Sequence, residues 1–193
     1  MENAQEKLLK EITCFLREQN IPYMITGAWS VIFWGGPRAS HDIDFVVELS
    51  KKDIKKTEKA FKILPDEFLI QTGVVEEAVT TSGFFNVLHL PTMLKMDFWL
   101  LEKNAFDKSR FLRRRKEIIL DQEMFVASPE DTIIQKLRWY KEGKIEKHLV
   151  DAAFVYNIQK KNLNTEYLDK WIEKLGLLSL FKEMKEVKLE NFL

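Results

Sequence analysis

Residues 23–49 read YMITGAWSVIFWGGPRASHDIDFVVEL, and this stretch decides the fold. The pattern predicts a strand over 21–26, a tight turn at Gly27-Ala28, a helix stopped by Gly35-Gly36-Pro37, and a strand over 42–47. Side chains alternate between faces along a strand. We therefore expect Asp42 and Asp44 on one face, with the intervening apolar residues pointing into the core.

Two carboxylates on one face repel each other, so one of them tends to stay protonated unless a cation lies nearby. A hard divalent cation such as Mg²⁺ removes this repulsion, because it takes oxygen ligands. Gly27 lets the backbone approach a ligand closely, and the free N–H groups that open the following helix form a phosphate site. The stretch therefore predicts phosphoryl or nucleotidyl transfer.

Gly27-Ala28, thirteen further residues and then Asp42-Ile43-Asp44 resemble the signature of the polymerase-beta-like nucleotidyltransferase superfamily. The longer run Arg38-Ala39-Ser40-His41-Asp42-Ile43-Asp44 is similar to the form found in small bacterial members. These members include the abortive-infection toxin nucleotidyltransferases. The resemblance implies an NTP substrate, catalytic carboxylates and divalent metal ions.

A third acid follows in the second of two apolar runs, 83–90 and 94–100, which predict strands joined by a turn at Pro91-Thr92. Asp97 lies in the middle of the second run, where strand propensity disfavours it. Local rules fail most often at functional sites. In the superfamily the third catalytic carboxylate lies on a later strand beside the acid pair, and the resemblance assigns this role to Asp97. The alternative is a strand Asp that faces solvent.

Residues 127–193 predict an antiparallel bundle of helices over 128–143, 145–158, 165–175 and 177–187. The run SPEDTIIQKL at 128–137 resembles the ED-x-I-x-x-K-L helix of the toxin-type relatives. This resemblance implies that Lys136 meets the triphosphate. Asp151 matches the Asp of the following helix, and we expect it to orient Lys136 or to cap a local network rather than to bind metal. The alternative for Lys136 is a surface lysine that buries only its stem.

The remaining patterns predict helices over 4–19, 51–64 and 105–115, a short edge strand over 68–70, a helical turn over 74–80, and a closing hairpin of 117–120 and 123–126 across Asp121-Gln122. The basic cluster Arg110–Lys116 is either a solvated helix face or a phosphate contact. The predicted fold is α+β: a mixed nucleotidyltransferase-type sheet flanked by helices, followed by a C-terminal helical bundle. The predicted domains are 1–126 and 127–193.

Two departures from the family pattern matter. Ala28 replaces the second Gly or Ser of the turn; its N–H can still bind phosphate, and we expect Ser30 to supply the missing hydroxyl. The arginine that some toxin relatives carry beyond the motif lysine is absent, and Gly143 and Lys144 stand near that place. This absence weakens the prediction of toxin activity more than that of catalysis.

Composition excludes several classes of protein. The 193 residues carry 30 basic and 30 acidic side chains, so no global field attracts nucleic acid, and no DNA partner is expected. Cys14 is the sole cysteine, which excludes an internal disulfide and fits a reducing cytoplasm. No apolar stretch is long enough to span a membrane, and no signal-peptide pattern opens the sequence. The three scattered histidines make a zinc site unexpected.

We therefore expect a Mg²⁺-dependent nucleotidyltransferase that moves an NMP from an NTP to an acceptor hydroxyl and releases pyrophosphate. Asp42, Asp44 and Asp97 would hold two Mg²⁺ ions, or Mn²⁺, with Asp97 also acting as base. The expected phosphate and charge contacts come from Gly27, Ala28, Ser30, Arg38 and Lys136. A small molecule such as an aminoglycoside, a protein side chain or a tRNA end could be the acceptor, and an antitoxin-like partner is possible. The alternative is a non-catalytic nucleotide- or partner-binding module that keeps this fold.

Overall fold

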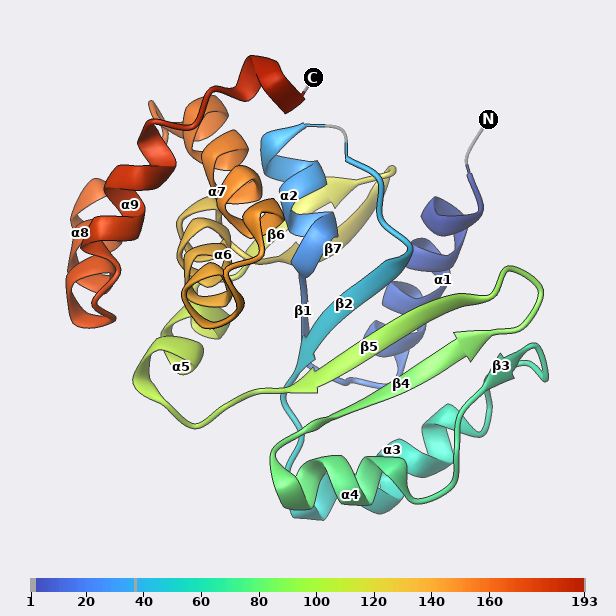
Figure 1. Ribbon diagram of the computed structural model, residues 1–193. Coiled ribbons are helices and arrows are strands. Elements are labelled where there is room, and N and C mark those ends of the chain that lie inside the picture. The colour runs from blue at the N-terminus through green and yellow to red at the C-terminus, as the bar shows by residue number, and fades with distance from the viewer. Residues whose placement is uncertain (1–2, 37, 193) are drawn as a thin grey trace. The chain divides into compact units, whose positions relative to one another are not determined.

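The computed structural model describes residues 3–36 and 38–192, which form two compact units (Figure 1). The first unit holds the described residues up to Ala28 together with Ala39–Val126. The second holds Trp29–Arg38 and the described residues from Ala127 on. Pro37, which the sequence predicts at a helix end, lies outside the described residues. The predicted α+β fold is confirmed, whereas the division into domains after residue 126 stays a prediction.

The described residues of the first unit include seven strands in one mixed sheet, in the order β3-β4-β5-β2-β1-β7-β6 (Figure 1). The pairs β2–β5 and β1–β7 are parallel, and the other neighbours are antiparallel. The strands are β1 (Tyr23–Thr26), β2 (Asp42–Val47), β3 (Phe68–Leu69), β4 (Phe84–His89), β5 (Leu94–Leu100), β6 (Arg115–Ile119) and β7 (Gln122–Val126). The predicted short strand at 68–70 is thus confirmed as an edge strand.

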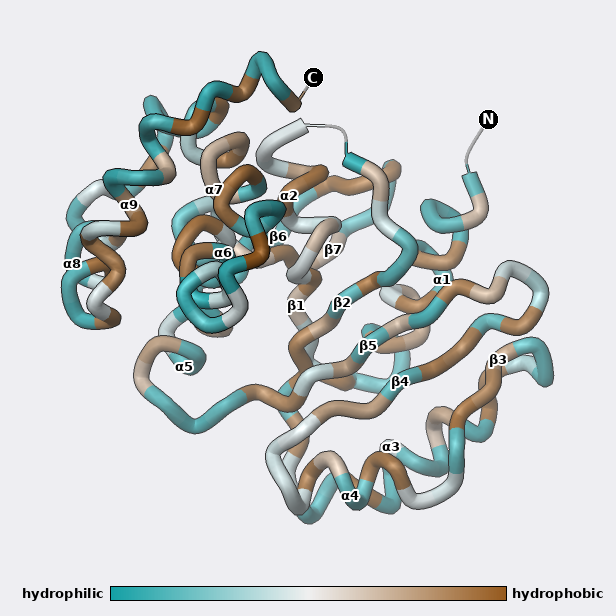
Figure 2. The backbone as a smooth tube through the Cα atoms, viewed as in Figure 1, coloured by the Kyte–Doolittle hydropathy of each residue, from teal (hydrophilic) through white to brown (hydrophobic). Residues whose placement is uncertain are grey.

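The helices of the first unit are α1 (Ala4–Glu18), α3 (Ile54–Phe61), α4 (Val74–Thr81) and α5 (Ala105–Leu112), with a 3₁₀ turn η1 (Lys51–Asp53) before α3. The start predicted at Ser50 is confirmed, because the Ser50 backbone N–H donates to Asp53 Oδ2 at 2.9 Å. Hydrophobic and hydrophilic residues alternate along α3 and α4 (Figure 2), which is the pattern of helices with one buried face.

The core of the first unit is a layer of aromatic rings on one face of the sheet. Phe45, Phe98 and Phe85 stack across β2, β5 and β4 with ring centroids 5.2 and 5.0 Å apart. Phe61 of α3 meets the edges of Phe85 and Phe98, and Phe15 of α1 meets Phe61. These contacts fix which face is buried, so the alternate residues of β2 and β5 must lie on the other face.

Three local predictions are corrected. No separate turn precedes α2 (Gly27–Gly35), because the helix begins at Gly27 itself. The helix predicted over 105–115 ends at Leu112, and Arg115 opens β6 instead. The hairpin between β6 and β7 turns at Leu120 and Asp121, whose φ angles of 51° and 61° suit a two-residue hairpin turn, and not at Asp121-Gln122.

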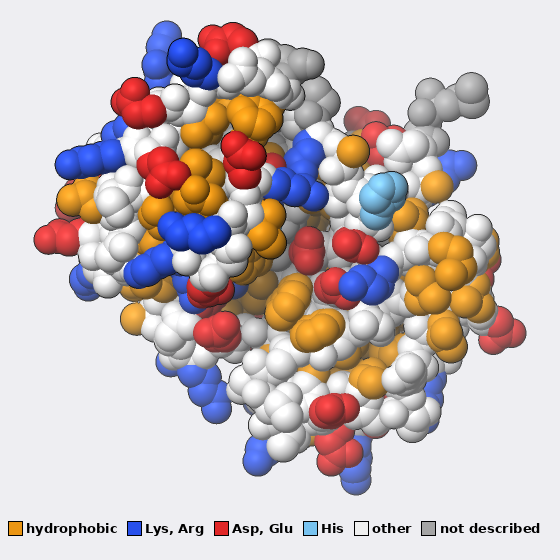
Figure 3. All heavy atoms as spheres, viewed as in Figure 1, with side chains coloured by type: hydrophobic (Ala, Val, Ile, Leu, Met, Phe, Trp, Pro, Cys, Tyr) orange, Lys and Arg blue, Asp and Glu red, His pale blue; other side chains and the backbone are white. Residues whose placement is uncertain are grey.

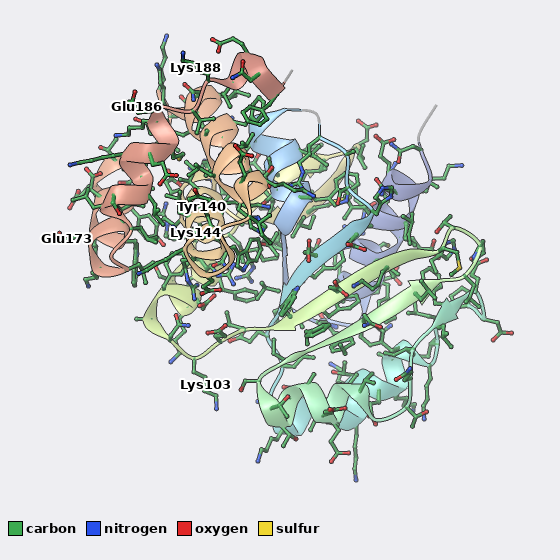
Figure 4. All side chains as sticks on the ribbon, viewed as in Figure 1. Lys103, Tyr140, Lys144, Glu173, Glu186 and Lys188 are labelled. Carbon is green, nitrogen blue, oxygen red and sulfur yellow. The ribbon has the colours of Figure 1, made fainter. Side chains whose placement is uncertain are left out.

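The second unit is helical, and its predicted helices are confirmed to within one or two residues at each end. They are α6 (Pro129–Gly143), α7 (Glu146–Gln159), α8 (Thr165–Lys174) and α9 (Leu178–Lys185), followed by a 3₁₀ turn η2 (Leu189–Phe192) that the sequence pattern missed. Ser128 caps α6 by accepting from the Asp131 backbone N–H. At the other end Lys144 adopts a φ of 52° and places Nζ 4.8 Å from the Tyr140 ring centre (Figure 4).

Most of α2 belongs to the second unit. The Trp34 indole N–H donates to the Ala127 carbonyl at 2.7 Å, and Gln159 Nε2 donates to the Trp34 carbonyl at 3.0 Å. A Cβ on Gly35 would lie 3.1 Å from the Val155 backbone nitrogen, so glycine is what allows α2 to approach α7 this closely. Among the described residues, the helices are all too short or too polar to cross a membrane.

Candidate active site

The three predicted acids share one face of the sheet in the first unit. In the parallel pair β2–β5, Asp44 stands opposite Asp97 and Asp42 stands opposite Lys95. Residues paired in register point to the same side of a sheet. Because Ile43, Phe45 and Phe98 face the aromatic core, the acids lie on the opposite face. Asp42 is exposed, Asp44 is half-buried and Asp97 is buried.

Gly27 lies directly against this acidic face. A Cβ added at Gly27 would fall 2.0 Å from Asp44 Oδ2, and the residue has a φ of +62°, which favours glycine. The sequence predicts that Gly27 admits a ligand, whereas the group that approaches it in the structure is the Asp44 side chain. Gly27 therefore sets the position of Asp44 at the junction between β1 and α2.

The loop before β2 is ordered by the motif serine. Ser40 Oγ donates to the Asp42 carbonyl at 2.9 Å, and Gln5 Nε2 of α1 donates to the Ser40 carbonyl. These bonds hold the start of β2, and with it Asp42. His41 is exposed and no role in the site follows from its place.

Lys95 supplies the positive charge on this face. Its Nζ lies 3.0 Å from Asp97 Oδ2, and the hydrogen bond to Asp97, together with the charges of Asp97, Asp42 and Asp44, raises the pKa of Lys95. The other oxygen of Asp97, Oδ1, is buried and has no hydrogen-bond partner. A buried carboxylate oxygen without a partner is unfavourable, so the position has acceptor capacity left for a further ligand.

Trp99 lies beside the acids. Its indole N–H donates to Asp44 Oδ1 at 3.4 Å, which is a long hydrogen bond. Acidic, basic and apolar side chains gather on the visible face over β2, β5 and β4 (Figure 3). The alternation in the sequence puts Lys95 and Trp99 on the face of Asp97, but it indicates no role for either residue.

One observation on this face speaks against a divalent cation site and several speak for one. Within residues 3–36 and 38–192, no three His, Cys, Asp or Glu side chains are grouped so that they could hold a metal ion. The donor set nevertheless fits Mg²⁺, because three carboxylates lie on one face and Asp97 Oδ1 lacks a hydrogen-bond partner. The negative charge of the three acids already attracts one cation, the Lys95 ammonium group. Lys95 holds Asp97 Oδ2, so Oδ1 is the oxygen of Asp97 that is left for a metal ion.

The second unit holds the other predicted charges. Asp151 of α7 accepts hydrogen bonds from Arg38 and from Lys136 Nζ, the latter at 2.7 Å. Lys136 is only 3% exposed, so it is not a surface lysine, and Asp151 does orient it. Two cations on one carboxylate leave this cluster with one net positive charge. Ser30 is also in this unit and is buried.

His148 borders the same cluster. Burial, together with the positive charges of Lys136 and Arg38, lowers the pKa of His148 to about 4, although Asp151 acts in the opposite direction. The ring is therefore neutral at pH 7 and adds no charge. Its Nδ1 is buried without a hydrogen-bond partner.

The two acids of the ED-x-I-x-x-K-L run have structural contacts. Glu130 Oε1 accepts from the Asn164 backbone N–H at 2.7 Å, and Asp131 Oδ1 accepts from the Tyr167 hydroxyl at 2.7 Å. Both acids are essentially unexposed. They tie the start of α6 to the start of α8, which sequence reasoning did not foresee because the pairing spans about one fifth of the chain.

Three side chains of the basic cluster Arg110–Lys116 have different surroundings. Arg110 is buried and its Nε lies 2.6 Å from Asp107, while Lys116 pairs with Glu123 on the surface. Arg114 stacks on Phe111 and lines a cavity of about 820 Å³. The residues after β2 and β5 also line this cavity, and none of the three acids does, so it is separate from the acidic face.

Comparisons with known proteins identify the family and the fold. The sequence model of the family described as "Nucleotidyl transferase AbiEii toxin, Type IV TA system" matches residues 24–177. No curated protein matches the sequence. Three solved structures share the fold. The antibiotic-resistance factor ANT(2'')-Ia has a TM-score of 0.61 and 15% sequence identity, and the match covers 95% of this chain and 97% of that one. An antigenic nucleotidyltransferase-like protein from Paracoccidioides brasiliensis has a TM-score of 0.56 and 16% identity, with 91% of each chain covered. The lincomycin-bound lincosamide antibiotic adenylyltransferase LnuA has a TM-score of 0.53 and 13% identity, with 79% of this chain and 97% of that one covered.

Proposed function

The chain belongs to the AbiEii nucleotidyl transferase toxin family, and from this membership we propose that it transfers an NMP from an NTP to an acceptor hydroxyl in a Mg²⁺-dependent reaction. One observation carries the proposal: the β2–β5 register, which sets Asp97 beside Asp44 on the face opposite the core. These positions are 53 residues apart in the sequence, and no packing need in an aromatic core explains acids at both.

In the proposed reaction the acceptor oxygen attacks the α-phosphorus of the NTP and forms a new P–O bond. The bond from the α-phosphorus to the bridging oxygen breaks, and pyrophosphate leaves. Asp97 takes the hydroxyl proton on Oδ1, the oxygen that has no hydrogen-bond partner, while Oδ2 lies against Lys95. Asp42, Asp44 and Asp97 are the proposed metal ligands, and bound Mg²⁺ or Mn²⁺ would offset the negative charge that develops on the phosphate oxygens.

Five residues are the proposed phosphate contacts. The backbone N–H groups of Gly27 and Ala28 open α2 and suit the β- and γ-phosphates. Ser30, Arg38 and Lys136 are proposed as further contacts, supported by the net positive charge that Arg38, Lys136 and Asp151 carry together. An NTP would compete with Asp151 for these two cations.

The deciding experiment uses each labelled NTP, Mg²⁺ and a cell extract as the source of acceptors. We expect label on an acceptor with the wild type, and at least a hundredfold less with Asp44→Ala or after EDTA, because loss of a metal ligand removes most of the stabilisation of the transition state. Asp66→Asn, at an exposed acid outside the site, is the matched control.

Nucleotide binding that ignores Mg²⁺ and survives Asp44→Ala, with no transfer to any acceptor, would instead establish a non-catalytic nucleotide-binding module. A toxin role and an antitoxin-like partner are also proposed, supported by the family description. They predict growth arrest when the chain is expressed, and its relief by Asp44→Ala.

A further inference from the structure

The sheet face of the proposed site contains a block of four neighbouring positions on β2 and β5. Asp42 stands opposite Lys95, and Asp44 stands opposite Asp97. Three of the four positions carry acids, and the fourth carries a lysine whose Nζ lies 3.0 Å from Asp97 Oδ2. Acidic and basic side chains lie next to one another over these two strands (Figure 3). The proposed reaction uses the three acids and gives Lys95 no role.

Lys95 interacts with the whole block and not only with its nearest acid. Neighbouring positions on one face are about 5 Å apart across a strand pair and about 7 Å apart along a strand. The hydrogen bond to Asp97, followed by the charges of Asp97, Asp42 and Asp44, raises the pKa of Lys95. The lysine is therefore held as a cation by all three carboxylates.

The charges of the block leave room for one divalent cation. Thr26 of β1 is paired with Asp44, and Asn86 of β4 is paired with Asp97, so these two flanking partners add no charge. Three acids and one lysine carry two negative charges together. Two divalent ions about 3.5–4 Å apart, as in two-metal sites, would with the lysine set five positive charges against three negative ones.

Lys95 also determines which oxygen of Asp97 is available. Oδ2 lies against the ammonium group, whereas Oδ1 is buried without a hydrogen-bond partner. A carboxylate can bind a hard cation through one oxygen or through both. With Lys95 in place, Asp97 presents Oδ1 alone.

We propose that Lys95 is a positioning residue of this site, which fixes Asp97 with Oδ1 presented to the reaction and takes the place of one divalent cation while no NTP is bound. The inference rests on the proposed function for the identity of the metal ligands, but metal binding can be measured without NTP and without turnover. The alternative is an ordinary ion pair on an open sheet face, which affects stability slightly and leaves metal binding unchanged.

The test is titration of the protein with Mn²⁺ in the absence of NTP, followed by the electron paramagnetic resonance signal of free Mn²⁺. We expect the wild type to bind one ion. Lys95→Met should bind Mn²⁺ about tenfold more tightly, because a repelling charge is lost and Asp97 gains a second free oxygen. Lys95→Arg keeps the charge and should bind Mn²⁺ as the wild type does.

Lys116→Met is the matched control. Lys116 of β6 also pairs with a carboxylate, that of Glu123 at 2.7 Å, but this pair is not part of the acidic block. The substitution should leave the affinity for Mn²⁺ unchanged. Thermal melting checks that each variant folds, and Lys95→Gln replaces Lys95→Met if the latter does not.

A positioning role also predicts that affinity and rate change in opposite directions. At saturating Mg²⁺, Lys95→Met should transfer label about tenfold more slowly although it binds metal more tightly, because Asp97 is no longer held in place. A contribution to stability alone would not produce this combination.

Three results would overturn the proposal: a wild type that binds no Mn²⁺ or two ions without NTP, equal affinity for Mn²⁺ in wild type and Lys95→Met, or transfer by Lys95→Met at the rate of the wild type. Failure of the proposed function gives a different result. An affinity for Mn²⁺ that depends on Lys95, in a protein that transfers no label, would keep the effect of Lys95 on metal binding and remove the reaction. Transfer that requires Asp44, with an affinity for Mn²⁺ that Lys95→Met does not alter, would do the reverse.

Discussion

Gly27 is fixed by two constraints that act together. Its φ of +62° is unfavourable for a residue with a Cβ, and the space that a Cβ would need is occupied by the Asp44 carboxylate. Gly73 has a φ of +83° but no atom within 4 Å of the position of a Cβ, so it carries only the first constraint. The two glycines therefore form a natural pair for comparison.

We expect Gly73→Ala to lower the free energy of unfolding by about 1–2 kcal/mol, because backbone strain is the only cost at this position. Gly27→Ala should lower it by more, because Asp44 must also shift, and it should reduce nucleotidyl transfer. Urea unfolding and the label-transfer assay measure the two effects. Equal losses of stability in both variants would show that the close contact between residue 27 and Asp44 adds nothing to the cost of the substitution in free energy of unfolding.

The identity of the acids could be predicted from the sequence, and their surroundings could not. Asp97 stands out because a carboxylate is unfavourable inside a strand with Met96 and Phe98 as neighbours. Lys95 and Trp99 are ordinary residues for an open sheet face, so nothing in the sequence singles them out. Their contacts with Asp97 and Asp44 exist only after the strands have paired.

At the scale of elements, α6 and α7 are joined by a buried ion pair. Lys136 and Asp151 are 3% exposed each, and Arg38 shares the same carboxylate. Removing one partner of a buried pair leaves the other charge without compensation, which costs about 3–5 kcal/mol. Lys116 and Glu123 join β6 and β7 at the same 2.7 Å distance, but both are more than half exposed.

Asp151→Asn should therefore lower the free energy of unfolding by about 3 kcal/mol, whereas Glu123→Gln should lower it by less than about 1 kcal/mol. Guanidinium unfolding with a fixed m-value compares the two variants. Equally small effects of the two substitutions would contradict the assignment of Lys136 and Asp151 as a buried ion pair that stabilises the fold.

Element types could be predicted wherever the periodicity was strong. Alternation of acidic and apolar residues marked the start of β2, two apolar runs marked β4 and β5, and Ser128-Pro129 with acids in the first turn marked the start of α6. The end of α5 was wrong because Arg115 continues the basic run of the helix in sequence, while its backbone already pairs with Val126. Pairing across a hairpin overrides the local pattern of charges.

At the scale of the whole molecule, equal numbers of acidic and basic residues make the formal net charge zero at pH 7. Global repulsion therefore contributes little to stability near neutrality. His148 contributes more, because its pKa is about 4 in the folded protein against 6.5 in the unfolded chain. Between these values the unfolded chain binds more protons, so stability falls as the pH falls.

We expect the free energy of unfolding to fall by about 2 kcal/mol between pH 6.5 and 4.5 on account of His148. Urea unfolding across this range should give a flatter profile for His148→Gln than for the wild type. His41→Gln, at an exposed histidine, is the control and should keep the slope of the wild type. A slope that His148→Gln does not change would refute this assignment.

The assignment of Trp29–Arg38 to the helical unit could not be foreseen. Residues 29–34 are apolar around the whole helix apart from Ser30, so the sequence indicates burial without indicating the partner. The Trp34 and Gly35 contacts that decide it involve residues about one hundred positions further along the chain. Patterns within a short window cannot carry such information.

The parallel pairing of β1 with β7 has a consequence for synthesis on the ribosome. β1 lies between β2 and β7 in the sheet, and its contact on one side joins Ile25 to Val126. While the ribosome is still adding the residues between them, one flank of β1 offers open backbone groups to any neighbouring extended chain. This protein would therefore depend on chaperone protection during that interval more than a protein whose central strand pairs on both sides with strands that are close to it in the sequence.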